Sequence, residues 1–498
     1  MLLFNLIHIS EPLCNLIVGV ISLWLVKYLW STIKRIRSLP PGPWGLPVVG
    51  YFPFIWKHNY LQFDKLSRRY GKVFSVKLGH LDVVLVCDWE HLKEALANDS
   101  LLGRPKGLII PGIIDHPSFV EMSDEPWRHH RRLSLHVLRD VGFGKSELET
   151  HINSEIDNFC DIIEKEPVRD FVQKLLPSIS NNVSFLLFGH YYDRNDPDKI
   201  LLDDSIIKLS PNVQFAGVAV FLPWIVRLLV IFKRANFDLV AKVFRSFDEA
   251  VQKEIDKHQE RYEPGRVVDY IDGYLNEQSK RKSQDDGLLF NIDTLRRNVS
   301  GFFGAGTETV TTTLSWALMY LIVYPKYQDK IFEEINEVIG FDRKPDYSHR
   351  NRMPITMAFI YEVHRLGSVL ASNLLRRATC DTKIGNHSIP KDTIVIFNFW
   401  SVHMNPNLWD NPEEFNPSRF LSEDGSKAVK PQYLVPFSGG KRICPGESLA
   451  NVEIFLYIVS IVQRFKIRTE PGTRVSLEAD FGLSRRPKDI PVLIFEKR

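Results

Sequence analysis

The sequence predicts one large, mainly α-helical domain with a small β region, preceded by an N-terminal membrane anchor. Residues from about Asp293 to Leu318 are apolar on nearly every face of a helix, a pattern that indicates a buried helix. Residues Val73 to Val86 are rich in β-branched side chains on either side of Gly79-His80, which is typical of a hairpin. Residues Leu13 to Val26 are nearly all apolar, and with the residues that follow they approach the ~20 that a spanning helix needs.

The composition favours a folded domain with no general affinity for nucleic acid. Hydrophobic residues make up 44% and charged residues 25% of the 498 positions, which is ordinary for globular proteins. The formal charge of +3, from 63 basic and 60 acidic residues, is too balanced for broad nucleic-acid binding. The 5 cysteines are scattered and lack CxxC spacing, which disfavours a disulfide framework and a structural zinc site. We therefore expect the folded part to face a reducing compartment.

The N-terminal segment divides the chain into two parts. Residues 1–38 form the expected anchor with its basic flank of Lys34, Arg35 and Arg37, and this positive charge keeps the rest of the chain in the cytosol. Residues 39–498 form the expected single folded domain, which opens on a stiff, proline-rich strut at 39–47. The alternative is a cleaved secretory signal, but no basic segment precedes the apolar run and no clear small-residue cleavage site follows it.

A second apolar stretch runs from Val213 to Phe232 and ends in Lys233 and Arg234. It is compatible with an ordinary pair of core helices. It is also compatible with a loop that dips into the surface of a membrane, because interfacial segments combine apolar and basic residues. The sequence leaves both interpretations open.

The most informative segment surrounds Cys444, from Phe437 to Gly446. A lone cysteine in a reducing compartment is usually a small buried hydrophobic residue. Here, glycines on both sides allow the backbone to fold tightly beneath a flat ligand, and the helix that starts near Glu447 adds positive potential that favours a thiolate. Arg442 is placed to pair with a carboxylate of that ligand, and Phe437 to shield the sulfur from water. The segment therefore predicts a thiolate that binds a metal centre.

This segment resembles the haem-binding signature FxxGxRxCxG of the cytochrome P-450 superfamily, which is a highly specific pattern. The resemblance extends over essentially the whole chain after the anchor. It implies the cytochrome P-450 fold for residues 39–498 and a bound haem b whose iron takes Cys444 as its axial ligand. The residues that match the signature, and that the resemblance places at the haem, are Phe437, Gly440, Arg442, Cys444 and Gly446.

Two further segments resemble structural motifs of this family, in the chain order that the family requires. Glu362-Val363-His364-Arg365 places a glutamate and an arginine three residues apart on one helix face, close enough to pair. This spacing alone is weak evidence because it is common on solvated helices. Residues 415–420 resemble the meander motif, whose arginine is Arg419 here. The resemblance implies that Glu362, Arg365 and Arg419 form a buried structural triad that supports the haem pocket.

Basic residues elsewhere are expected to hold the haem propionates. Trp127 and Arg131 lie four residues apart, so a helix places both on one side, although a solvated basic helix has the same spacing. The resemblance implies that both bind propionates, where charge-assisted hydrogen bonds to a guanidinium are strong. Arg376 is expected to add a further contact, with Arg377 as the competing choice. The preceding Ala371-Ser372-Asn373 departs from the usual proline of the family, which leaves the backbone path there open.

A small polar segment, Ala305-Gly306-Thr307-Glu308-Thr309, interrupts the long apolar helix. A threonine in the middle of a helix commonly bonds to its own backbone. The segment resembles the oxygen-binding AGx[D/E]T pattern of the family, and the resemblance implies a catalytic function. Gly306 leaves room for dioxygen and water, Thr309 orients that water, and Glu308 relays protons as a carboxylic acid connected to solvent.

The resemblance implies a haem-thiolate monooxygenase of the animal microsomal type, in the clan of drug- and steroid-oxidising members. Such an enzyme uses O2 and reductase-supplied electrons to hydroxylate a small lipophilic substrate that is a xenobiotic, a steroid or fatty-acid-like. We find no flavin or nicotinamide fingerprint, so the electrons are expected to come from NADPH through a separate flavoprotein reductase, with cytochrome b5 as a second partner. The implied location is the endoplasmic reticulum membrane, with the catalytic domain in the cytosol. A local basic surface for the reductase is expected at Arg128, Arg132 and Lys441.

The expected substrate pocket is placed only by position in the chain. The segments 105–120, 299–305, 369–375 and 481–484 are largely apolar, which favours a lipophilic substrate. Two other functions are compatible with the same cysteine. A reductase-independent haem-thiolate isomerase or dehydratase has no need of a proton relay, so the intact segment 306–309 argues against it. A non-catalytic haem-binding protein is the other alternative, and it binds ligands without consuming NADPH.

Overall fold

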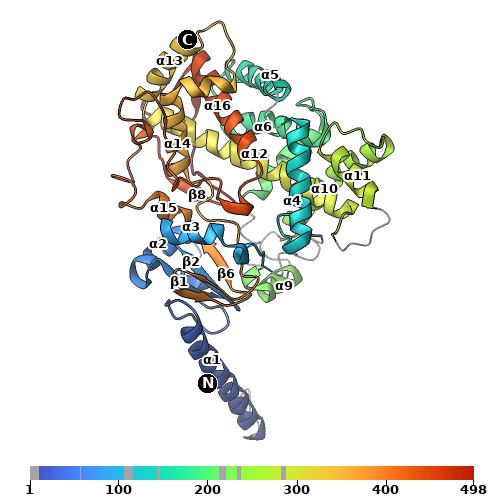
Figure 1. Cartoon of the computed structure of the whole chain (residues 1–498), viewed down its shortest axis with the longest axis vertical. Helices are drawn as coiled ribbons and strands as arrows, with labels where there is room; N and C mark the ends of the chain where they lie inside the picture. Colours follow the sequence, from blue (N-terminus) through green and yellow to red (C-terminus); the bar gives the residue numbers. More distant parts are fainter. Residues whose placement is uncertain are drawn as a thin grey trace, which may run out of the picture.

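The computed structural model describes residues 11–55, 58–105, 116–142, 146–211, 220–232, 237–281 and 288–498. Figure 1 shows a large helical body, a smaller β region below it, and α1 projecting away at the N-terminal end. The helices are α1 (Glu11–Ser38), α2 (Asn59–Tyr70), α3 (Trp89–Ala97), α4 (Asp124–Val141), α5 (Ser146–Ile163), α6 (Phe171–Phe188), α7 (Pro197–Leu209), α9 (Pro223–Ile231), α10 (Phe237–Glu260), α11 (Tyr270–Arg281), α12 (Ile292–Val323), α13 (Lys326–Val338), α14 (Pro354–Gly367), α15 (Phe399–His403) and α16 (Glu447–Arg464). This confirms the prediction of a mainly helical protein with a small β region.

The strands form small sheets, the largest of which has four strands in the order β1-β2-β6-β3. β1 and β2 are the predicted hairpin, antiparallel with Val73 opposite Val86, and Gly79 makes the turn with a φ of +55° that suits glycine. β2 pairs with β6 in parallel, and β3 pairs with β6 in antiparallel orientation. The strands are β1 (Val73–Leu78), β2 (Leu81–Val86), β3 (Arg376–Arg377), β4 (Thr382–Ile384), β5 (His387–Ile389), β6 (Ile394–Phe397), β7 (Phe465–Thr469), β8 (Ala479–Phe481), β9 (Arg485–Pro487) and β10 (Leu493–Lys497).

The long helix α12 is the predicted buried helix and is slightly longer than the predicted 293–318. The side chain of Asn291 accepts a hydrogen bond from the Thr294 N–H and caps its first turn. α6, α12 and α16 contribute side chains to one hydrophobic core. Gly306 lies where α6 crosses, because a Cβ added there would be only 3.1 Å from a methyl group of Val183. The close packing holds α12 firmly in the centre of the helical body.

The C-terminal half of α1 contacts the β region and the strut. Arg35 pairs with Asp82 at 2.9 Å, and the Tyr28 hydroxyl donates to the Gly45 carbonyl at 2.9 Å. The strut that follows packs along β1, where the Ser75 N–H donates to the Pro41 carbonyl at 2.9 Å. Within the described residues, no helix combines the length and the apolar character needed to cross a membrane. The expected anchor therefore remains a prediction, and residues 1–10 lie outside the described part of the chain.

The apolar stretch from Val213 to Phe232, predicted either as core helices or as a membrane-facing loop, has both buried and exposed apolar side chains among its described residues. Residues 212–219 lie outside the described residues, and the remainder forms the short helix α9 with the residues around it. Phe221 and Val226 are buried against the four-stranded sheet. Leu228 and Phe232 are exposed. One side of this helix is thus part of the core, while the other presents large apolar side chains.

Candidate active site

The segment around Cys444 forms a tight loop between α3 and the start of α16. Gly440 has a φ of +66°, and a Cβ added to it would lie 2.1 Å from the Leu96 carbonyl oxygen of α3. The Cys444 N–H donates to the Phe437 carbonyl at 3.0 Å, which closes the loop on itself. The ring of Phe437 packs edge-on to His364 of α14, with 5.3 Å between ring centroids. Glycine at 440 is therefore required by both conformation and space.

The sulfur of Cys444 has surroundings suited to a bound thiolate. Cys444 keeps accessible surface, so a ligand can reach it. The protein around the thiol raises its pKa through burial, whereas the N–H groups of Gly446 and Glu447 and the charge of Arg131 oppose that rise. Hydrogen bonds and a nearby cation are the usual means by which a protein favours a thiolate. Because the net pKa is raised, the anion needs a further partner, and a metal ion supplies one.

Four arginines gather beside this loop. Burial lowers the pKa of Arg104, Arg131, Arg376 and Arg442 and is the largest cause for each. Neighbouring arginines lower the pKa of Arg104, Arg376 and Arg442 further. The pKa of Arg442 falls to about 7 and that of Arg376 to about 9. Buried cations at such close range require anions. The cluster thus fits a ligand that carries carboxylates, as the two propionates of haem do.

Two buried donors in this cluster have no acceptor among the described residues, the Trp127 Nε1 and the Arg376 Nε. Buried donors without partners are uncommon in proteins, and they mark places where a ligand group fits. Arg377, by contrast, pairs with Asp392 at 2.7 Å and donates to the Arg104 carbonyl at 2.8 Å. Its Nε and Nη1 donors are already used within the protein. This favours Arg376 of the two competing arginines, and its contact with a propionate stays a prediction.

Arg442 and Arg131 also bond to backbone carbonyls, and their expected contacts with a ligand carboxylate stay a prediction. Arg442 donates to the carbonyls of Leu102 at 2.9 Å and Met122 at 2.6 Å, and its guanidinium lies 3.9 Å from the ring centroid of Trp127. Arg131 donates to the Ile443 carbonyl at 2.6 Å. Both arginines thus join the cysteine loop to neighbouring segments. The sequence could not indicate these carbonyls, since their positions depend on the tertiary path of the chain.

The expected triad residues lie together in the core. Arg365 donates from Nε and Nη2 to the two carboxylate oxygens of Glu362 at 2.7 and 2.8 Å, and Arg419 donates to Glu362 at 3.2 Å. The side chains of Glu362 and Arg365 are fully buried. Arg365 also donates to the carbonyls of His403 and Pro412 at 2.9 and 2.6 Å. This network ties α14 to the chain that leads into the cysteine loop.

On α12, the polar segment is divided between two faces. Thr309 donates to the Ala305 carbonyl at 2.8 Å, the local bond that mid-helix threonines commonly make, and Ala305 is exposed. Glu308 is buried and points elsewhere, because Oε1 accepts hydrogen bonds from the hydroxyls of Ser210 at 2.9 Å and Ser484 at 2.5 Å. Burial raises the pKa of Glu308, and these hydroxyls oppose the rise. The two residues expected to act together are thus held by different partners.

The expected substrate segments are only partly described. Residues 106–115 lie outside the described residues, and beyond them Phe119 stacks on Phe302 with 5.0 Å between ring centroids. Val299 is fully buried in the core. The Asn373 backbone N–H and side-chain oxygen both bond to Phe397 of β6, at 3.1 and 2.8 Å. These bonds fix the backbone in the segment that departs from the usual proline of the family.

The basic surface expected near the cysteine loop is partly neutralised. Arg128 pairs with Glu125, and Lys441 pairs with Asp99 at 2.5 Å. Next to it lies a surface pocket of about 420 Å³ whose lining includes Lys93, Lys430, Phe437 and Ile443. Two lysines that the sequence reasoning missed thus lie at this surface, and one of them, Lys430, pairs with Glu447 at 3.4 Å. No motif marks Lys93 or Lys430, which reach this surface only through the fold.

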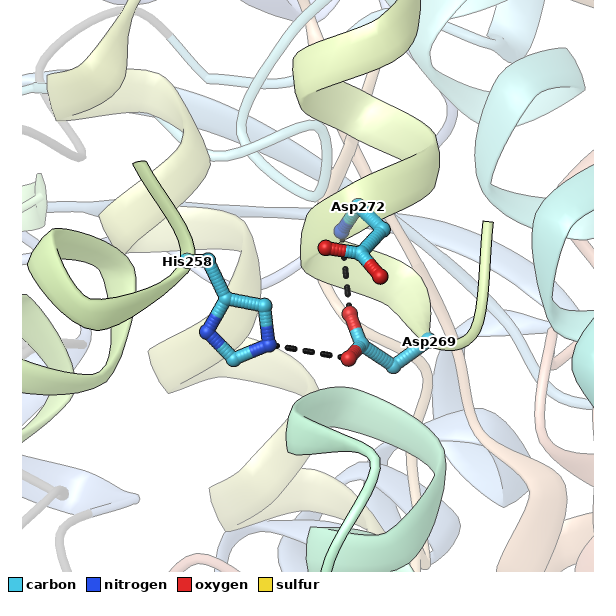
Figure 2. Close-up of side chains that lie close together, drawn as sticks. All are labelled: His258, Asp269 and Asp272. Carbon is cyan, nitrogen blue, oxygen red and sulfur yellow. Dashed lines mark hydrogen bonds and ion pairs between the residues drawn. The ribbon is translucent and has the colours of Figure 1, made fainter. Parts of the chain in front are cut away.

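A separate buried cluster, His258, Asp269 and Asp272, has the composition of a cation site (Figure 2). His258 Nε2 lies 2.8 Å from Asp269, and its Nδ1 lies 2.6 Å from the Glu254 carbonyl. The Asp272 N–H donates to Asp269 at 2.9 Å, and the Arg261 guanidinium lies 3.2 Å from the same carboxylate. Burial alone lowers the pKa of His258, but Asp269 outweighs it and the net pKa is raised. The cluster is therefore an internal ion pair that joins the end of α10 to the start of α11.

Comparison with known proteins agrees with the fold and the cysteine loop. The family model described as Cytochrome P-450 matches residues 40–494. The chain is 33% identical to cytochrome P-450 2J2 of Homo sapiens over 464 residues, which cover 91% of this chain and 90% of the relative. It is 30% identical to cytochrome P-450 2J1 of Oryctolagus cuniculus, over 95% of this chain and 94% of the relative. It is also 30% identical to cytochrome P-450 1A5 of Gallus gallus, over 91% and 89%.

The chain belongs to the cytochrome P-450 family. It is accordingly a monooxygenase, an oxidoreductase with a haem cofactor and electrons supplied by a reductase.

Proposed function

We propose that this protein hydroxylates a small lipophilic compound with O2, taking its electrons from NADPH through a separate flavoprotein reductase. The observation that carries the proposal is the accessible Cys444 beside four clustered arginines. At this cluster the buried Arg376 Nε and Trp127 Nε1 have no acceptor among the described residues. In the overall reaction, substrate, O2, NADPH and a proton give hydroxylated product, water and NADP⁺. The haem, when bound, supplies the activation of O2.

The residues of the chain have distinct parts in this proposal. Arg376 and Trp127 hold the propionates, since their buried donors have no acceptor within the described protein. Cys444 ligates the iron, and Phe437 and the glycine-shaped loop keep water from the sulfur. Thr309 and Glu308 move protons toward the oxygen-binding face of α12. The triad of Glu362, Arg365 and Arg419 contributes by holding the chain that leads into the cysteine loop.

The electron donor is proposed to dock on the surface around the cysteine loop. The lining of the pocket there contains Lys93 and Lys430, and the exposed Arg132 extends the positive charge along α4. Positive charge mainly raises the rate of association with an acidic partner. An NADPH-dependent flavoprotein reductase is the proposed principal partner, with cytochrome b5 as a second electron donor at the same surface.

We also propose that the protein is held at the endoplasmic reticulum membrane with its catalytic domain in the cytosol. α1 exposes large apolar side chains, with Leu23 and Trp30 each 73% exposed. The exposed Leu228 and Phe232 at α9 add apolar surface near the β region, from which α1 also projects. A lipid surface is the environment that accommodates such side chains.

Turnover that requires both NADPH and O2 tests the proposed function. Purified protein, combined with a microsomal reductase and the lipophilic probe 7-ethoxycoumarin, is expected to release 7-hydroxycoumarin and acetaldehyde only when both are present. Thr309→Ala is expected to lower the product formed per NADPH, because protons are then delivered less selectively. Rearrangement or dehydration of an organic hydroperoxide without NADPH or O2 would favour the isomerase or dehydratase alternative. Ligand binding without any NADPH consumption would favour a non-catalytic haem protein.

A further inference from the structure

The carboxyl group of Glu308 is held by hydroxyl groups from two distant segments. Ser210, just after the end of α7, donates to Glu308 Oε1 at 2.9 Å. Ser484, in the turn between β8 and β9, donates to the same oxygen at 2.5 Å. Thr312 lies one helical turn further along α12, and its hydroxyl is 3.5 Å from this oxygen. Ser210, Glu308 and Ser484 are all buried, so water does not replace these bonds.

The two segments also bind each other. The Leu483 N–H donates to the Ser210 carbonyl at 3.0 Å. A Cβ added to Gly482 would lie only 2.7 Å from that carbonyl oxygen, so the backbones are in direct contact. The end of α7 and the β8–β9 turn therefore meet over α12, one residue from Thr309. Any movement of either segment away from α12 removes a hydrogen bond from Glu308.

We infer that Ser210 and Ser484 are positioning residues for proton delivery, because they hold Glu308 in place where the end of α7 and the β8–β9 turn meet over α12. The inference rests on the proposed monooxygenase function and assigns that function two residues that no sequence motif marks. Glu308 Oε2 is buried and has no hydrogen-bond partner among the described residues, so it is the carboxyl oxygen on which the relayed proton is carried in this inference.

The charges around Glu308 are consistent with this assignment. Burial favours its neutral form, whereas the serine hydroxyls and the charge of Arg486 on β9 favour the carboxylate. Arg486 itself pairs with Asp480 at 3.2 Å. A proton relay works best when the pKa of the group lies near the working pH. Loss of either serine hydroxyl moves the pKa of Glu308 further upward, so that the group releases its proton less readily.

Ser210→Ala and Ser484→Ala test the inference, with Ser205→Ala as the matched control. Ser205 is also a buried serine of α7, but its hydroxyl donates to the Leu201 carbonyl at 2.7 Å and not to Glu308. With 7-ethoxycoumarin, reductase and NADPH, we expect each test variant to form about 5-fold less product per NADPH, in line with one lost hydrogen bond. The remaining NADPH is consumed with O2 and a proton to give hydrogen peroxide.

Three further measurements separate positioning from a purely structural effect. Product formation driven by added hydrogen peroxide needs no separate delivery of protons to O2, so we expect it to be unchanged in both variants. The pH at which product per NADPH is half-maximal is expected to rise in both variants and to return in Ser210→Thr and Ser484→Thr. The third measurement does not depend on 7-ethoxycoumarin. The rate of NADPH consumption without substrate is measured in H2O and in D2O, and the ratio is compared between the wild type and the two variants.

Wild-type-like product per NADPH and an unchanged pH profile in both test variants would overturn the inference and leave the proposed function intact. A wild-type protein that needs neither NADPH nor O2 would overturn the proposed function itself. Because the two serines lie in different segments, either variant alone carries the test if the other does not fold.

Discussion

Replacement of Glu362 with alanine is expected to leave little folded, haem-loaded protein. The substitution removes the carboxylate that accepts hydrogen bonds from Arg365 and Arg419 and leaves both guanidiniums inside the protein, where they are 0% and 9% exposed. Breaking a buried ion pair by removing one partner costs about 3–5 kcal/mol. Domains are stable by only about 5–15 kcal/mol, so much of the stability is lost. Chemical denaturation followed by circular dichroism, together with the haem content per chain, measures the effect.

Two controls sharpen this prediction. Arg419→Met keeps the two-pronged contact between Glu362 and Arg365, so its cost is expected to be smaller than that of Glu362→Ala. Glu413→Ala alters an exposed glutamate in the same neighbourhood and is expected to change stability by less than about 0.5 kcal/mol. If Glu362→Ala and Glu413→Ala were equally stable, the buried triad would have no part in holding the cysteine loop.

Gly440→Ala is expected to damage the cysteine loop directly. Alanine at a φ of +66° costs about 1–3 kcal/mol in backbone strain, and its Cβ would lie 2.1 Å from the Leu96 carbonyl, so the loop or α3 must move. We expect lower thermal stability and a weaker thiolate-type spectrum of the haem-bound protein. Gly446→Ala is the matched control, because Gly446 has a φ of −93° and the nearest atom to its added Cβ is the Cys444 sulfur at 4.0 Å.

If Gly440→Ala and Gly446→Ala had the same thermal stability and the same thiolate-type spectrum, the backbone requirement assigned to position 440 would be contradicted. The comparison is informative because both glycines belong to the same signature and flank the same cysteine. Only one of them needs glycine for its conformation and its close approach to α3. The sequence pattern alone does not distinguish these two positions.

The parts of the molecule that follow from local patterns were predictable from the sequence. The apolar periodicity around α12 and the β-branched run of β1 and β2 depend on neighbouring residues, and both elements form as expected. The spacing of Glu362 and Arg365 on one helix face likewise brings them together, at 2.7 Å. Short-range geometry determines each of these features.

Contacts between distant segments could not be predicted in this way. Nothing in the sequence near Arg104 indicates that it joins the arginine cluster, and nothing near Ser210 or Ser484 indicates that their hydroxyls converge on Glu308. The same holds for Arg442, whose donors are taken by the carbonyls of Leu102 and Met122. In each case the tertiary fold brings the partner close, and the spacing of residues along the sequence does not predict that contact.

The most direct test is the difference spectrum of the dithionite-reduced, CO-bound protein in microsomes, compared with that of Cys444→Ala. A strongly red-shifted Soret band in the wild type that disappears in the variant is the predicted result, and it establishes thiolate ligation by Cys444. Folded, haem-loaded wild-type protein without that band would show that Cys444 is not the ligand, and the monooxygenase mechanism proposed for this chain would be wrong.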